Sequence, residues 1–169
     1  MLGDPVRVNY VPLPRLERFA NLRSGAVDVL IRNTTWTSTR DSSAGMSFAG
    51  VSYYDGQGFM VPASRGIHSV KELGGVTVCV GTGTTSELNL ADYFAAHSLT
   101  YTPLTFATHD ETAQAYLADR RAAYTADASS LYSVRVQQVR PKDHVILLSS
   151  QRSRLGPPCV RTTCSGSRS

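Results

Sequence analysis

The sequence predicts an α/β fold built on a mostly parallel, doubly wound sheet. Between residues 59 and 148, short apolar runs typical of buried strands alternate with segments that carry apolar residues at helical spacing. The links are short, and three Ser or Thr residues are each followed three positions later by Glu, the pattern of a helix start. Hydrophobic residues make up 41% of the chain and charged residues 18%, as in ordinary globular proteins.

The start of the chain predicts a strand, a helix and a second strand. Residues 6–11 alternate enough for a short strand, which a proline ends. Apolar residues at helical spacing follow, and Gly25 predicts the end of that helix. Residues 27–31 form a β-branched and apolar run typical of a buried strand. Residues 53–58 combine Asp, Gln and two Gly, which favours a turn.

The later alternation divides into strands and helices that can be placed individually. Strands are predicted at residues 59–61, 76–80, 101–106, 122–125 and 145–148, and long helices at 86–97, 110–118 and 129–138. Pro103 indicates that its strand lies near an edge, because proline cannot donate to a strand ladder. From Gln151 onward the chain is rich in Arg and Ser without periodicity, so residues 149–169 are predicted to form an irregular, disordered tail.

A polar stretch follows the strand predicted at residues 27–31. Residues 33–39 gather amide and hydroxyl side chains, and Arg40 closes the group. A guanidinium can hold a planar carboxylate by two parallel hydrogen bonds, so the stretch suits a carboxylate ligand. A polar loop whose arginine makes a surface ion pair is an equally good interpretation at this point.

Two more polar groups follow predicted strands. The Gly- and Thr-rich turn at residues 81–85 opens a helix whose N–H groups suit an anion, although it lacks the lysine of a nucleotide-binding loop. Asp127 either receives an ammonium group or caps the next helix. Ligands of open α/β sheets bind beyond the carboxyl ends of the strands, which is where both groups lie.

Other function classes find little support in the sequence. The net charge of +4 is modest and no basic stripe stands out, so no nucleic-acid partner is predicted. Four histidines and three cysteines show no metal-ligand spacing, and no metal or cofactor is predicted. No Ser-His-Asp set or carboxylate pair suggests hydrolysis. No apolar run approaches the roughly 20 residues that span a bilayer, and no signal-peptide pattern is present.

Taken together, these segments resemble the periplasmic solute-binding proteins of amino-acid ABC transporters, most of all the general L-amino-acid-binding branch. The segments that carry the resemblance are residues 32–37 with Arg40, 53–61, 78–80, 82–85, 87–94 and 123–125 with Asp127. The resemblance extends from about residue 3 to residue 148 and is far more specific than one short motif.

The resemblance implies an α/β fold of the periplasmic-binding-protein-like type II, with one largely complete doubly wound lobe and a partial first lobe. Residues 1–61 are expected to form the partial first lobe and to end in the hinge strand. Residues 62–148 are expected to form the second lobe, and residues 149–169 the irregular tail. Gly81 stands where the resemblance implies a glutamine.

The function that the resemblance implies is binding of a free L-amino acid between two lobes, for delivery to the membrane permease of an ABC transporter. Arg40 would hold the ligand carboxylate and Asp127 the α-ammonium group. The predicted ligand-binding residues are Arg32, Asn33, Thr35, Arg40, Thr82, Thr85, Ser86 and Asp127. We expect a periplasmic monomer that is not an enzyme. The alternatives are a non-functional truncated or frameshifted fragment of such a protein, and an enzyme on the same fold.

Overall fold

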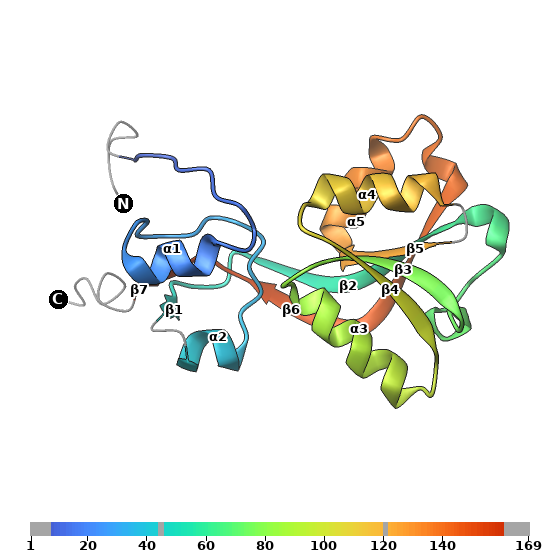
Figure 1. The fold of residues 1–169 in the computed structure, drawn as a ribbon, viewed down its shortest axis with the longest axis horizontal. Helices are drawn as coiled ribbons and strands as arrows, with labels where there is room; N and C mark the ends of the chain where they lie inside the picture. Colours follow the sequence, from blue (N-terminus) through green and yellow to red (C-terminus); the bar gives the residue numbers. More distant parts are fainter. Residues whose placement is uncertain (1–7, 44–45, 120–121, 161–169) are drawn as a thin grey trace.

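The chain forms a larger and a smaller region, joined by two long paired strands (Figure 1). The computed structural model describes residues 8–43, 46–119 and 122–160. We call the larger region, residues 57–149, the sheet lobe, and the smaller one, residues 8–52 with 156–160, the partial lobe. The two joining strands are β2 (Tyr53–Pro62) and β6 (His144–Leu155).

The sheet lobe is built on a mixed sheet with the strand order β4-β3-β5-β2-β6. Its remaining strands are β3 (Val76–Gly81), β4 (Tyr101–Phe106) and β5 (Ala123–Asp127). β3 pairs in parallel with β4 and β5, as predicted, and β4 is the predicted edge strand. β2 instead pairs antiparallel with both β5 and β6. β2 is therefore the one strand of this sheet that runs opposite to the other four, and β6, which pairs with β2, runs in the same direction as β5. The sheet is mostly parallel, as predicted, except at β2, along which the chain enters the lobe before it leaves along β6.

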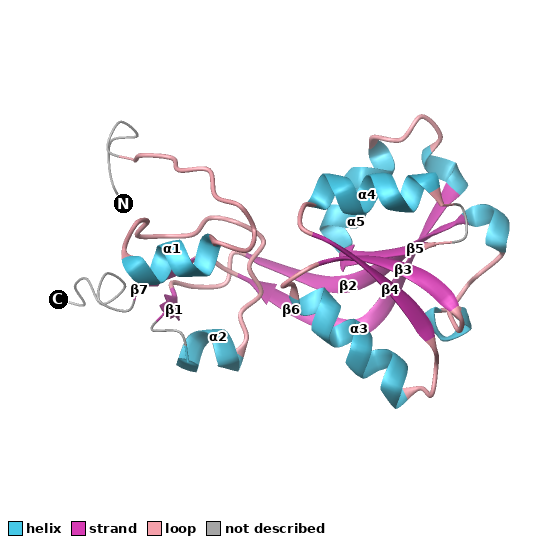
Figure 2. Ribbon diagram, in the orientation of Figure 1, coloured by secondary structure: helices cyan, strands magenta, loops and turns pink. Residues whose placement is uncertain are grey.

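Helices cover both faces of this sheet, as a doubly wound lobe requires (Figure 2). They are α3 (Thr85–Ala96) on one face, and α4 (His109–Ala118) and α5 (Ala128–Val136) on the other. Val78 of β3 belongs to the same buried cluster as Phe94 of α3. The next residue, Cys79, belongs to the cluster of Tyr116 of α4 and Leu131 of α5. Alternation along a strand therefore supplies both halves of the core.

The predicted helix starts are confirmed at α3 and α4. Thr108 accepts a hydrogen bond from the Glu111 N–H while Glu111 accepts one from the Thr108 N–H, a complete capping box. Thr84 likewise accepts from the Glu87 N–H, but the Glu87 carboxylate accepts from the Gly83 N–H instead. Ser69 caps only a 3-10 turn, Val70–Glu72. Two similar turns are Ala63–Arg65 and Pro141–Asp143.

Residues 53–58 form the first half of β2, and the predicted turn there is wrong. Tyr53 pairs with Leu155 of β6, and the register shifts between Gly56 and Gly58. Such a bulge accommodates the glycines within a strand. Asp55 accepts hydrogen bonds from its own neighbour Gly56 and from the Ser129 hydroxyl at the start of α5. The residues that predicted a turn therefore form a β-bulge within β2 and a hydrogen bond to the start of α5.

The partial lobe contains less regular structure than predicted. Its elements are α1 (Arg18–Ser24), α2 (Ser38–Ser43), β1 (Met46–Phe48) and β7 (Pro158–Val160). Gly25 ends α1 with a left-handed φ of 77°, as predicted. The predicted strand at residues 6–11 is absent over residues 8–11, and residues 6–7 lie outside the described part. In residues 27–31, Val29 makes only an isolated bridge to Cys159. Within the described part of the chain, neither run has a neighbouring strand long enough to complete a ladder with it.

The predicted irregular tail at residues 149–169 is wrong for residues 149–160. β6 continues to Leu155, and β7 pairs antiparallel with β1. Leu155 and Cys159 are only 5% and 3% exposed. Their pairing partners lie about a hundred positions away in the sequence, so local composition does not indicate the strands. Residues 161–169 lie outside the described residues.

Candidate functional site

A cavity of about 280 Å³ lies where the partial lobe meets the sheet lobe. The partial lobe contributes residues at and just before α1, the polar stretch after residue 31, and α2. The sheet lobe contributes the carboxyl ends of β3 and β5 and the first turns of α3, α4 and α5. The cavity therefore lies beyond the strand ends, where open α/β sheets bind ligands.

Seven of the eight predicted ligand-binding residues line this cavity. They are Arg32, Asn33, Thr35, Arg40, Thr85, Ser86 and Asp127. Thr82 does not line it, since it is the first residue after β3 and its N–H donates to the Phe106 carbonyl at 2.9 Å, extending the β3–β4 pairing.

Two hydrogen bonds join the lobes at the cavity. The Asn33 amide donates to an Asp127 carboxylate oxygen at 3.1 Å. The hydroxyls of Thr35 and Thr85 lie 3.0 Å apart in a second hydrogen bond. Each pair combines a side chain of the polar stretch with one at the end or start of a sheet-lobe element. The predicted polar residues therefore meet across the junction.

Arg40 is held in place on the wall that the partial lobe contributes. Its Nη1 donates to the Thr35 carbonyl at 2.9 Å, and its backbone N–H donates to the Thr37 hydroxyl at the start of α2. Its Cζ lies 5.0 Å from the centre of the Phe19 ring, within the range of a cation–π contact. Burial lowers the pKa of Arg40, but Asp127 opposes this shift. A guanidinium fixed in this way is a preformed partner for a carboxylate.

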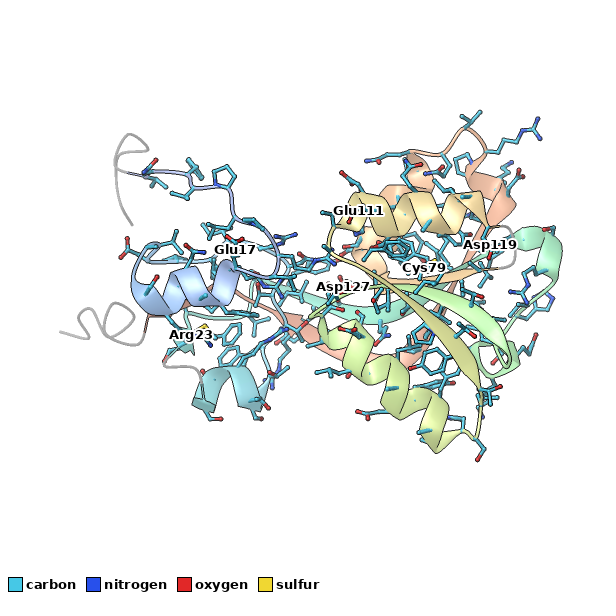
Figure 3. All side chains as sticks on the ribbon, in the orientation of Figure 1. Glu17, Arg23, Cys79, Glu111, Asp119 and Asp127 are labelled. Atoms are coloured by element: carbon cyan, nitrogen blue, oxygen red, sulfur yellow. The ribbon has the colours of Figure 1, made fainter. Side chains whose placement is uncertain are left out.

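Asp127 supplies a carboxylate on the opposite wall. It ends β5 and lies at the junction of the two regions (Figure 3). Its side chain makes no hydrogen bond to the start of α5, so of the two roles predicted for it the cap is absent. Burial, followed by the charge of Asp55, raises its pKa, while the Asn33 hydrogen bond and the charges of Arg40 and Arg15 lower it. The Asn33 hydrogen bond and the two arginine charges therefore offset only part of the effect of burial on the Asp127 pKa.

Two arginines that the sequence did not indicate, Arg15 and Arg18, also line the cavity. Arg18 is only 5% exposed, and burial together with Arg40, Arg32 and Arg15 lowers its pKa to about 10. Burial also lowers the pKa of Arg15. Their positions at the start of an amphipathic helix are typical of solvated side chains, so local sequence gives no signal for this role.

His109 and Tyr124 form another part of the wall that the sequence did not indicate. The Tyr124 hydroxyl lies 2.7 Å from the His109 Nδ1 in a hydrogen bond. Burial raises the pKa of Tyr124, and burial followed by the charge of Arg15 lowers that of His109. Both groups are therefore held in their neutral forms at neutral pH. They add a polar edge without adding charge.

The fold and the cavity define a two-lobed α/β chain of the periplasmic-binding-protein-like type II. A solved structure described as an ABC transporter / periplasmic binding protein from Brucella ovis with glutathione bound superposes with a TM-score of 0.88. The two sequences are 49% identical, and the superposed region covers 95% of this chain and 51% of the Brucella ovis chain. No protein-family model matches the chain.

Curated relatives agree with this structural match. The glutamate/glutamine/aspartate/asparagine-binding protein BztA of Rhodobacter capsulatus is 52% identical over 147 residues, which is 87% of this chain and 44% of BztA. The general L-amino acid-binding periplasmic protein AapJ of Rhizobium johnstonii is 50% identical over 147 residues, 43% of its length. The chain thus belongs to the family of solute-binding proteins of amino-acid ABC transporters, and it spans less than half the length of these relatives.

No described helix has the length and apolar character needed to cross a membrane. Among the described residues, no group of three or more His, Cys, Asp or Glu side chains is arranged to hold a metal ion.

Proposed function

We propose that the cavity binds a free L-amino acid, which the whole protein delivers to the permease of an ABC transporter in the periplasm. The observation that carries this proposal is the position of Arg40 and Asp127 in one cavity on walls contributed by different lobes. An amino acid carries a carboxylate and an ammonium group, and each requires a fixed opposite charge when it leaves water. Arg40 receives the carboxylate and Asp127 the ammonium group.

The hydroxyl and amide groups around these charges support the same ligand class. Thr35, Thr85 and Ser86 line the cavity and can satisfy the remaining carboxylate lone pairs. The Asn33–Asp127 hydrogen bond orients the carboxylate that receives the ammonium group. Because these groups come from both lobes, a bound ligand links the lobes and favours a closed arrangement.

Binding, rather than a chemical reaction, is the role that we propose for the cavity. The relatives BztA and AapJ are named as binding proteins, and BztA is named for acidic amino acids and their amides. The Brucella ovis relative was solved with glutathione, whose γ-glutamyl group carries a free α-amino and a free α-carboxyl group. Small derivatives that keep both groups are therefore further candidate ligands. We propose that the protein acts as a monomer, since one cavity between two lobes of one chain is sufficient for this task.

Calorimetric titration of the chain with a panel of L-amino acids tests the proposal. Arg40→Ala and Asp127→Ala each remove one charged partner in a closed site, a loss of about 2–5 kcal/mol, which is roughly thirty- to several-thousand-fold in affinity. Arg23→Ala is the matched control, because Arg23 is an exposed arginine of α1 away from the junction (Figure 3). No heat of binding with any amino acid would overturn the proposal. If Arg40→Ala abolished binding and Asp127→Ala left the affinity unchanged, the ligand would be a simple carboxylate instead of an amino acid.

A further inference from the structure

The cavity carries more positive charge than a zwitterionic amino acid needs. Four guanidinium groups line it: those of Arg15, Arg18, Arg32 and Arg40. Asp127 is the one acidic side chain among the described residues that line it. If Asp127 receives the ligand ammonium group and Arg40 the α-carboxylate, the other three arginines have no anionic partner from the ligand or from the wall.

Two of these arginines have buried nitrogens without a hydrogen-bond partner. The Nη1 of Arg15 and the Nε of Arg18 are fully shielded, and neither donates to another group. A buried guanidinium donor without an acceptor is costly, and in a binding cavity a ligand group commonly completes it. Arg15 lies in the turn that leads into α1, three positions before Arg18, so the two side chains project from the same side of that segment.

The position of Arg15 depends on the glycine at the end of β3. A Cβ placed on Gly81 would overlap the Arg15 Nη1 and lie 2.9 Å from its Cζ. The neighbouring Leu16 packs on the turn that follows β3, where its Cδ2 would lie 3.2 Å from a Cβ placed on Gly83. The φ of Gly81 does not lie in the left-handed region, so the glycine is needed for space rather than for its backbone conformation. The absence of a side chain at position 81 admits the Arg15 guanidinium to the cavity wall.

We propose that Arg15, supported by Arg18, forms an anion subsite that selects ligands with a second carboxylate, such as glutamate or aspartate, over their amides. This inference rests on the proposed amino-acid binding. A side-chain carboxylate offers only acceptors, which match the unpartnered guanidinium donors. The amide of glutamine has nearly the same shape but presents N–H donors of its own, so it leaves a buried donor unsatisfied. Discrimination therefore arises from repulsion of the amide as well as attraction of the acid.

The test compares L-glutamate with L-glutamine by calorimetric titration of the unaltered chain, Arg15→Ala, Gly81→Ala and the control Arg23→Ala. The unaltered chain is expected to bind glutamate roughly ten- to a hundred-fold more tightly than glutamine, as for a hydrogen bond to a charged group. Arg15→Ala is expected to remove most of that preference by weakening glutamate alone. Gly81→Ala is expected to reduce it as well, since its methyl group displaces the end of a flexible side chain and leaves the backbone in place. Arg23→Ala, which removes the same charge from the same segment, is expected to keep the full preference.

The outcomes separate this inference from the proposed function. Equal affinity of the unaltered chain for glutamate and glutamine would overturn the anion subsite while leaving amino-acid binding intact. An equal loss of both ligands on Arg15→Ala would also overturn it, because a merely structural role does not distinguish an acid from its amide. Binding of no amino acid at all would overturn the proposed function and this inference with it. Far-ultraviolet circular dichroism of each variant checks that the fold is kept.

Discussion

The sheet lobe and the partial lobe both contain apolar runs that suit strands, yet these runs have different outcomes. In the sheet lobe, five strands pair with one another, and buried clusters fill both faces of the sheet. In the partial lobe, β1 and β7 pair over three residues, and the cluster consists of Leu22, Leu30 and Met46. An apolar run becomes a strand only where neighbouring strands satisfy its backbone groups, and residues 27–31 have one bridge for this purpose.

The lobes also contribute different things to the cavity. The sheet lobe supplies groups at the ends of regular elements, such as Asp127 at the end of β5 and Thr85 at the start of α3. The partial lobe supplies long cationic side chains and an irregular polar stretch. One wall is therefore built from the ends of regular elements, whereas the other depends on hydrogen bonds such as those that hold Arg40 to Thr35 and Thr37.

The mutation with the greatest cost to stability is expected in the core of the sheet lobe. Phe94 is fully buried and its ring lies 4.6 Å from that of Tyr101 and 6.3 Å from that of Phe59. Phe94→Ala is expected to lower the free energy of unfolding by about 3–5 kcal/mol, because it leaves a cavity in a close-packed cluster. Urea unfolding followed by circular dichroism measures this. A loss below about 1 kcal/mol would mean that this cluster does not hold the lobe together.

A smaller and more local effect is expected in the partial lobe. Leu22→Ala removes a fully buried side chain from a cluster of three and is expected to cost about 2 kcal/mol, the low end for such changes. The cost should fall on the partial lobe alone, because its buried cluster shares no residue with the two buried clusters of the sheet lobe. Amide exchange in α1 and β7 should accelerate while exchange in β3 and β5 stays the same. Equal acceleration in both lobes would show that they unfold as one unit.

Loss of a helix cap in the sheet lobe should cost less again. Thr108→Ala removes the hydroxyl that accepts from the Glu111 N–H at the start of α4. We expect a loss of about 1 kcal/mol in the free energy of unfolding, as for other capping residues. Thr108→Ser, which keeps the hydroxyl, is the control and should be close to the parent. A loss as large in the serine variant would assign the effect to the methyl group instead of the cap.

A small gain in stability, rather than a loss, is expected from a substitution at the junction of the two lobes. Burial and Asp55 raise the pKa of Asp127 above its ordinary value, so the folded chain binds this proton more tightly than the unfolded chain does. Stability from this group is therefore present at low pH and is lost as the pH rises through the raised value. Asp127→Asn should make the ligand-free chain slightly more stable at neutral pH, whereas it should weaken the proposed binding of an amino acid. Unfolding measured from acidic to neutral pH checks this, and a less stable variant at neutral pH would contradict it.

Most of the sheet lobe could be predicted from the sequence, because the signals for its helices and strands are local. The capping residue Thr108 placed the start of α4, and Pro103 placed an edge strand. In the partial lobe, Gly25 placed the end of α1 in the same local way. The polar stretch and Asp127 were also visible as candidate site residues, because ligands of open α/β sheets bind beyond the strand ends, where these hydroxyl, amide and charged groups gather. Each of the capping signals acts within about one turn of its own residue.

The features that join distant segments could not be predicted from the sequence and are visible only in the folded chain. β6 extends to Leu155 because Tyr53 is there to pair with it, and no local pattern marks that contact. Arg15 enters the cavity wall because Gly81, which lies on another lobe, leaves space for its guanidinium. The Tyr124–His109 hydrogen bond likewise joins β5 to α4. Composition and periodicity describe each segment separately, whereas these contacts depend on where the folded chain brings two segments together.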